Sequence, residues 1–197
     1  MFVKLIMLGD TCVGKTSFVR KFIHNNIPNA HTPTIGAAMS SKRINRNNFS
    51  FDMHIWDTAG QERYSSLTTL YYKSSNIAII MYDITNRYSF SRAQKYIYSV
   101  KENGPDDIVI GLIGNKNDIA INDPKKRAVT YSTGKEFADF HNIWFAETNV
   151  FNINDVPCVF NTLIDMLPEH TFNSQDTLHD IILDNKNITQ NGCCIIS

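Results

Sequence analysis

The sequence predicts an α/β fold, a mostly parallel sheet with helices on both faces. Short and nearly continuous apolar runs alternate with segments of helical periodicity along the chain. Strands buried on both faces of a parallel sheet have this composition. Polar motifs follow three of the apolar runs directly. Because ligands of such folds bind beyond the carboxyl ends of the strands, we expect the functional site there.

Each element is predicted from its own pattern. The strands are expected at Phe2–Leu8, Phe51–Trp56, Ile77–Asp83, Ile108–Gly114 and Ile143–Glu147. Alternating apolar residues favour a strand in the second of these runs. Helical spacing predicts helices at Lys15–His24, Tyr88–Asn103, Tyr131–His141 and Val156–Leu167.

The segment after the first strand has the phosphate-binding pattern G-x-x-x-x-G-K-[ST]. The glycines at its two ends let the backbone wrap a polyphosphate, and the N–H groups of the loop and of the next helix face the oxygens. Lys15 adds a positive charge near the β- and γ-phosphates, and the Thr16 hydroxyl is placed to bind Mg²⁺. The pattern indicates a nucleoside triphosphate. The residues expected to contact it are Gly9, Asp10, Thr11, Cys12, Val13, Gly14, Lys15, Thr16 and Ser17.

A D-T-A-G-Q segment (residues 57–61) follows the predicted strand Phe51–Trp56. The Asp57 carboxylate, at the carboxyl end of a strand, can hold Mg²⁺ through water. Gly60 just beyond it lets a backbone N–H reach the γ-phosphate. This segment therefore predicts the metal and γ-phosphate side of the site.

An N-K-N-D segment (residues 115–118) follows another buried run and selects the base. An ionised Asp118 accepts hydrogen bonds from N1–H and the 2-amino group of guanine, whereas adenine offers neither donor. Sites that depend on such a bond discriminate by roughly 10⁴–10⁵. The predicted nucleotide is GTP, with Asn115, Lys116 and Asp118 as contacts.

In order along the chain, GDTCVGKTS, PTIG, WDTAGQERY, GNKND and FAETN resemble the small GTPases of the Ras superfamily. TIGAA, WDTAGQERY, LYYK and MYDITN are similar to the Rab branch, and TIGAA to its early-endosomal subgroup. The resemblance covers residues 1–168 and implies a P-loop NTPase G domain with a six-stranded sheet, in which Lys42–Asn45 belongs to an antiparallel edge strand. It implies a monomeric switch that hydrolyses GTP to GDP and recruits effectors in vesicular membrane trafficking.

The resemblance also assigns roles to single residues. Thr34 matches the switch threonine that binds Mg²⁺ and the γ-phosphate in the GTP state, so the expected metal ligands are Thr16, Thr34 and Asp57. Gln61 would orient the attacking water while Lys15 stabilises charge on the transferring group. The expected guanine loop is Thr148, Asn149 and Val150. The expected effector surface is Ile35, Met39, Trp56 and Tyr71.

Four features depart from the family pattern. Ile27 stands where an aromatic residue usually packs on guanine, and T-N-V-F (residues 148–151) replaces the usual S-A-K loop. Met39 replaces an effector-surface aromatic, and Thr11 is bulkier than the usual glycine or serine near the γ-phosphate. An alternative therefore stays open, a GTP-binding scaffold with impaired cycling. The intact metal-ligand and water-orienting residues favour a switch that cycles.

Composition agrees with one domain and a sizeable core in 197 residues. The net charge of zero argues against bulk attraction to nucleic acid. No apolar stretch approaches the roughly 20 residues of a membrane span. The four cysteines form neither a disulfide nor a zinc pattern, which fits a reducing cytosol.

The chain is expected to leave the domain at Pro168 and to continue as a flexible polar tail over residues 169–192. The last segment, residues 193–197, fits the C-a-a-X prenylation pattern at Cys194, with Cys193 as a second acceptor. Because the tail is not polybasic, two lipids are favoured over a single farnesyl group. The resemblance implies the cytoplasmic face of an endosome-like membrane and a cytosolic pool. The implied partners are an exchange factor, a GTPase-activating protein, a GDP-dissociation inhibitor or escort protein, and effectors.

Overall fold

The computed structural model describes residues 1–26, 34, 36–46, 49–60 and 71–172. A six-stranded sheet in the order β2-β3-β1-β4-β5-β6 runs through the domain. β2 pairs antiparallel with β3, and all other neighbours are parallel. The strands are β1 (Phe2–Gly9), β2 (Ala37–Arg46), β3 (Phe49–Thr58), β4 (Ile77–Asp83), β5 (Val109–Asn115) and β6 (Trp144–Glu147). The predicted fold class is confirmed.

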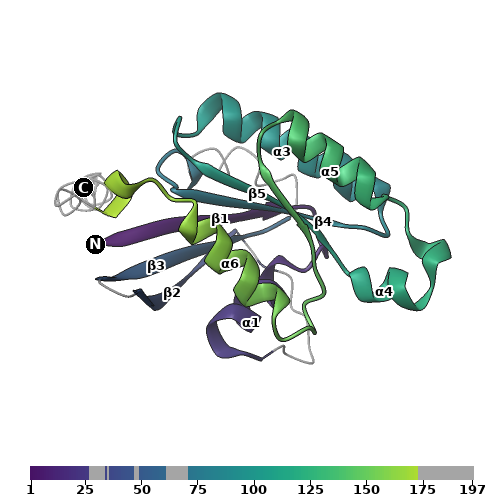
Figure 1. Ribbon diagram of the computed structural model, residues 1–197, viewed down its shortest axis with the longest axis horizontal. Helices are drawn as coiled ribbons and strands as arrows, with labels where there is room; N and C mark the ends of the chain where they lie inside the picture. The colour runs from purple at the N-terminus through teal and green to yellow at the C-terminus, as the bar shows by residue number, and fades with distance from the viewer. Residues whose placement is uncertain (27–33, 35, 47–48, 61–70, 173–197) are drawn as a thin grey trace, which may run out of the picture.

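Helices cover both faces of the sheet (Figure 1). One face carries α1 (Lys15–His24) and α6 (Asp155–Asp165), and the other carries α3 (Arg87–Asn103) and α5 (Tyr131–Phe140). Every helix in the described part of the chain is too short or too polar to cross a membrane.

Each face of the sheet has its own apolar core. Under α1 and α6, the rings of Phe22 and Phe160 stack with centroids 3.7 Å apart. Under α3 and α5, Tyr82 meets Phe90 edge to ring at 4.8 Å. Every residue of β4 and β5 is buried, as parallel strands covered on both sides require.

The predicted bounds of the apolar strands and of the four helices lie within two residues of the observed ones, and two further elements were not delimited by the sequence. β2 contains Lys42–Asn45, as predicted, and runs over ten residues as an antiparallel edge strand whose side chains alternate in burial. α4 (Asn117–Asn122) is a six-residue helix that no sequence pattern predicted, because six residues show too little of the helical period.

Packing continues past Pro168. A 3₁₀ turn, η3 (Glu169–Phe172), follows it directly, and the Phe172 ring lies 5.5 Å from that of Phe51 in the core. The first residues of the predicted tail are thus packed on the domain. Figure 1 shows this end of the chain near the N-terminus, opposite the edge at which β1 ends.

Tyr82 carries a buried hydroxyl with no hydrogen-bond partner among the described residues. The Gly114 and Gly134 backbones leave room for it, since a Cβ at either would come within 2.8 Å of the hydroxyl oxygen. Burial and the charge of Glu147 raise the pKa of Tyr82, so the hydroxyl stays neutral. Tyr82→Phe should therefore raise the free energy of unfolding by about 1 kcal/mol, measured by urea unfolding.

The matched control is Tyr72→Phe. The Tyr72 hydroxyl lies 2.7 Å from Ser99 Oγ, so its removal should lower the free energy of unfolding by about 1 kcal/mol. If both variants lose stability equally, the Tyr82 hydroxyl has a partner after all.

Candidate nucleotide-binding site

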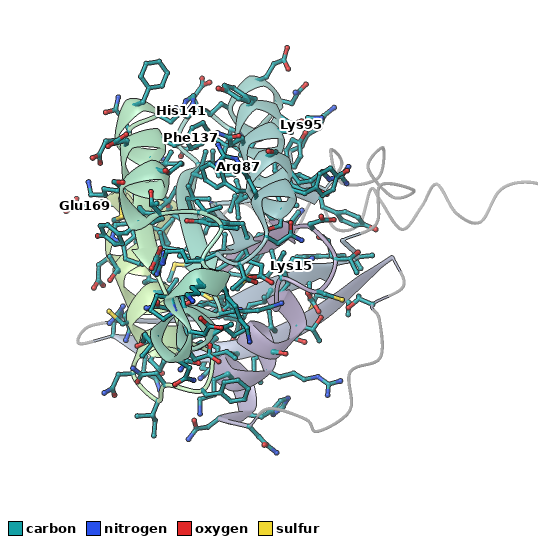
Figure 2. The ribbon with its side chains drawn as sticks, turned by 90° about the vertical axis from the view of Figure 1, so that its right-hand side faces the viewer. Lys15, Arg87, Lys95, Phe137, His141 and Glu169 are labelled. Atoms are coloured by element: carbon teal, nitrogen blue, oxygen red, sulfur yellow. The ribbon has the colours of Figure 1, made fainter. Side chains whose placement is uncertain are left out.

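The predicted site residues gather at the edge of the sheet where the parallel strands end. Figure 2 looks onto this edge and shows Lys15 near its middle. The loop between β1 and α1 supplies the phosphate-binding pattern, the end of β3 supplies Asp57, and the end of β5 leads into the base-reading segment. Gln61, Ile35, Ile27, Cys193 and Cys194 lie outside the described residues.

The phosphate loop is folded around the Lys15 side chain. The Lys15 ammonium donates to the carbonyls of Gly9 and Asp10, at 2.9 and 2.7 Å. Gly14 begins α1 with a φ of 105°, and no side chain caps the helix. The free N–H groups at the start of α1 and the Lys15 ammonium therefore form a site that favours an anion.

Burial lowers the pKa of Lys15 to about 8, although Asp57 and Asp10 act in the opposite direction. A buried ammonium is costly unless a negative partner is close. Phosphate oxygens would supply that partner. The loop therefore favours binding of a polyphosphate through its own electrostatics.

Three side-chain oxygens meet beside the phosphate loop. Thr16 Oγ1 lies 2.6 Å from Asp57 Oδ2 and 3.0 Å from Thr34 Oγ1. The second carboxylate oxygen, Asp57 Oδ1, is buried and has no hydrogen-bond partner among the described residues. Burial raises the pKa of Asp57, while the hydrogen bond from Thr16 and the charge of Lys15 lower it. Two hydroxyls and an unsatisfied carboxylate oxygen are a donor set that fits Mg²⁺.

Gly60 presses directly against the phosphate loop. A Cβ at this position would come within 2.4 Å of both Asp10 C and Thr11 N. Any side chain here would push the segment after β3 away from the loop. The Gly60 backbone is therefore close enough to contact a phosphate that the loop would bind.

Asn115 joins the base-reading segment to its neighbours. Its side-chain amide donates to the Val13 carbonyl at 2.8 Å, and its Oδ1 accepts from the Thr148 hydroxyl at 3.4 Å. Asn117 N also donates to the Thr148 carbonyl at 3.1 Å. Three loops from distant parts of the chain are thus held together.

Two groups remain free for a base. The half-buried Asp118 carboxylate accepts no hydrogen bond and forms no ion pair within the described part of the chain. The Val150 N–H likewise donates no hydrogen bond there, although Asn149 N and Phe151 N on either side of it both donate. A free carboxylate and a free N–H are the complement of the guanine edge.

Sequence reasoning missed two ion pairs that support these loops. Arg127 binds both carboxylate oxygens of Glu147, at 2.6 and 2.8 Å, and also donates to Asn117 Oδ1 at 3.1 Å. Lys116 pairs with Asp83 at 2.6 Å. Because each pair joins residues from separate elements, no local motif could have revealed it.

Three of the predicted effector-surface residues are described. Met39 is 55% exposed and pairs with Trp56 across the β2–β3 ladder. The Trp56 ring lies 5.3 Å from that of Tyr71. The structure therefore brings Met39, Trp56 and Tyr71 together on one surface.

The fold and the site define a P-loop GTPase. Residues 4–169 match the family model described as the Ras family, and the chain belongs to that family. Its relatives place it in the Rab branch of small GTPases, which hydrolyse GTP.

Three relatives illustrate the similarity. The chain is 35% identical to "GTP-binding protein YPT53" of Saccharomyces cerevisiae, over 94% of this chain and 86% of that protein. It is 38% identical to "Ras-related protein Rab-17" of Mus musculus, over 81% and 73%. It is 34% identical to "Ras-related protein Rab-17" of Homo sapiens, over 97% and 90%.

The lowered pKa of Lys15 predicts a pH dependence of nucleotide binding. Without nucleotide, the ammonium loses its proton as pH rises through about 8. Phosphates favour the charged form, so GDP binding near pH 8 should take up part of a proton, and the affinity should fall as pH rises further. Calorimetry in two buffers of different ionisation enthalpy measures this uptake.

The matched control is Lys15→Met, which binds more weakly and lacks the titrating amine. Its buffer-dependent heat should be absent under the same conditions. A wild-type protein whose binding heat is the same in both buffers would contradict the assignment.

Proposed function

We propose that this chain is a Rab-type switch that cycles between GTP and GDP and recruits effectors to a membrane while GTP is bound. The observation that carries the proposal is the meeting of Thr16, Thr34 and Asp57 oxygens beside the Lys15 ammonium. These oxygens come from the phosphate loop, from the segment before β2 and from β3. A ligand bound among them therefore controls how three segments sit together.

In the proposed mechanism, Lys15 and the N–H groups of the phosphate loop bind and orient the β- and γ-phosphates. Thr16, Thr34 and Asp57 would hold Mg²⁺, which supplies positive charge against the phosphate oxygens when bound. Gln61 orients the attacking water. The phosphate loop and the segment around Thr34 contain no arginine, so a GTPase-activating protein would add one, worth roughly 10³–10⁵ in rate.

The base is selected at the other end of the site. Asp118 accepts from N1–H and the 2-amino group of guanine, and the Val150 N–H donates to O6. Asn115 and Lys116 hold this segment, and Thr148 and Asn149 shape the loop opposite. The absence of another partner for Asp118 and for the Val150 N–H in the described structure supports this assignment.

Hydrolysis changes the effector surface because Thr34 and Gly60 both reach toward the γ-phosphate. Loss of that phosphate removes their ligand and releases the segments that flank β2 and β3. Ile35, Met39, Trp56 and Tyr71 lie on or next to those segments in sequence. Effectors would therefore bind the GTP state.

Membrane attachment would come from prenyl groups on Cys193 and Cys194. One lipid gives only marginal, reversible binding, and the tail lacks a basic patch, so two lipids are the consistent anchor. The proposed location is the cytoplasmic face of an endosome-like membrane, with a cytosolic pool held by a GDP-dissociation inhibitor. An exchange factor would load GTP.

The second candidate is a GTP-binding scaffold that hydrolyses GTP poorly. Thr11 favours it, because this residue is bulkier than the glycine or serine usual near the γ-phosphate and its backbone lies against Gly60. Turnover of bound GTP distinguishes the two candidates.

We expect slow single-turnover hydrolysis of GTP by the purified protein, followed as release of inorganic phosphate. Gln61→Leu should bind GTP as tightly as the wild type and lose the stimulation of about 10³–10⁵ that an activating protein gives. Retained GTP with no hydrolysis in the wild type would establish the scaffold instead.

Asp118→Asn should change the base preference. The amide can donate to the 2-oxo group of xanthine, where the carboxylate accepted from the 2-amino group of guanine, so GTP binding weakens and xanthosine triphosphate binding improves. Titration with both nucleotides measures the change, and Asp123→Asn, at the end of the same short helix, is the control. Equal wild-type affinity for ATP and GTP would refute the assignment.

A further inference from the structure

We infer that Asp83 is a positioning residue that slows the release of guanine nucleotide by holding Lys116. The inference rests on the proposed function, because its ligand is the nucleotide of the same site. Asp83 is the last residue of β4 and belongs to none of the nucleotide motifs.

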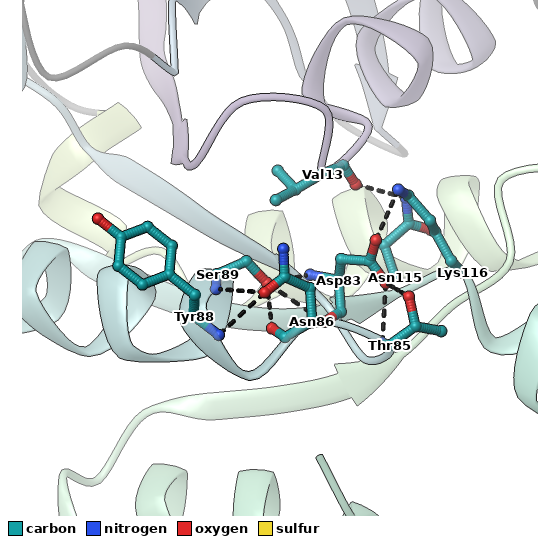
Figure 3. Close-up of polar contacts among 8 residues, drawn as sticks. All are labelled: Val13, Asp83, Thr85, Asn86, Tyr88, Ser89, Asn115 and Lys116. Carbon is teal, nitrogen blue, oxygen red and sulfur yellow. Dashed lines mark hydrogen bonds and ion pairs between the residues drawn. The ribbon is translucent and has the colours of Figure 1, made fainter. Parts of the chain in front are cut away.

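The contact between the two residues is close. Lys116 Nζ lies 2.6 Å from Asp83 Oδ2, with side-chain exposures of 30% and 12%. Figure 3 shows the pair in a group of polar contacts that extends to Asn115 and Val13. Because the carboxylate is largely buried, salt screens the pair less than it screens a surface ion pair.

Lys116 needs a tether because its backbone is strained. Its φ of 69° and ψ of 35° are left-handed, a conformation that L-residues with a side chain rarely adopt. It also begins α4 without any side-chain cap. Asp118 lies in the first turn of this helix, so the direction of the base-reading carboxylate depends on the turn at Lys116.

Asp83 is itself fixed on its other side. Its Oδ1 accepts from Thr85 N and Thr85 Oγ1, at 2.8 and 2.6 Å. Its backbone N–H donates to Ser89 Oγ at 3.0 Å, and Ser89 Oγ donates to the Asn86 carbonyl at 2.7 Å. Asn86 caps α3 through its side chain. The carboxylate therefore has one oxygen for Thr85 and one for Lys116, and the backbone of Asp83 is joined to α3 through Ser89.

The ion pair thus connects the base-reading turn to the rigid end of β4 and the start of α3. Without the negative charge, the Lys116 ammonium loses the only partner that it has among the described residues, and the strained turn loses its tether. The nucleotide would then leave more readily. The phosphate loop, joined to this turn through Asn115 and Val13, would keep its own contacts around Lys15.

The first test measures release of a fluorescent GDP analogue after addition of excess unlabelled GDP. Asp83→Asn keeps the size and can still accept from Thr85, but it removes the charge. We expect release to become about tenfold faster, because a partly exposed lysine loses a buried partner. Single-turnover hydrolysis of already bound GTP should stay within about twofold of the wild type, since the phosphate side is unchanged.

A double-mutant cycle tests whether Asp83 acts through Lys116. Lys116→Met alone should also speed release. If the two residues act as one unit, adding Asp83→Asn to Lys116→Met should give no further acceleration. Effects that simply multiply would overturn the inference, because Asp83 would then act by another route.

Two further variants separate positioning from general stability. Ser99→Ala removes a hydrogen bond of α3 with Tyr72 but leaves Asp83 untouched, so release should not change. Thr85→Val removes one hydrogen bond to Asp83 and keeps the charge, so release should speed up less than in Asp83→Asn. If Asp83→Asn does not fold, Thr85→Val in the wild-type and Lys116→Met backgrounds gives the same comparison.

The possible failures are distinguishable. A wild-type protein that does not retain GDP refutes the proposed function. A wild-type protein that retains GDP, and releases it no more slowly than Asp83→Asn, refutes the role of Asp83 alone.

Discussion

The site depends on one side chain, the Asn115 carboxamide at the end of β5. It donates to the Val13 carbonyl of the phosphate loop and accepts from Thr148 of the guanine loop. Gly14 allows this approach, because a Cβ there would come within 2.4 Å of the Asn115 amide nitrogen. Asn115, at the end of a central strand, therefore fixes the position of the phosphate loop relative to the guanine loop. This part of the site is formed before a ligand binds.

The same site contains buried charge that the protein alone does not satisfy. Lys15 is bound by carbonyls and its pKa is lowered to about 8, and Asp57 Oδ1 has no hydrogen-bond partner in the part of the chain that the structure describes. Both features disfavour the empty state, since buried polar groups without partners are costly. A phosphate and a cation would satisfy both groups at once. Satisfying these two buried groups would therefore add to the affinity for a nucleotide and its cation, beside the new contacts that the ligand makes.

The sequence predicted the parts whose cause is local. Continuous apolar runs gave the central strands, and Ile77–Asp83 and Lys15–His24 were predicted with the bounds that the structure has. The ends of β2 could not be predicted, because an edge strand whose side chains alternate in burial has no continuous apolar run. The tethers Asp83–Lys116 and Arg127–Glu147 were missed because each joins residues at least 20 positions apart, and only the fold brings them together.

Apart from the link through Asn115, different contacts stabilise the two ends of the site, and this division bears on the proposed switch. Thr34 and Gly60 lie beside the phosphate loop, while the ion pairs of Lys116 with Asp83 and of Glu147 with Arg127 support the loops of the base side. Loss of that phosphate therefore removes ligands from the effector-facing segments and leaves the base-side tethers intact. In the proposed switch, GDP would stay bound after hydrolysis for that reason, and a partner that speeds exchange would weaken contacts that hydrolysis does not touch.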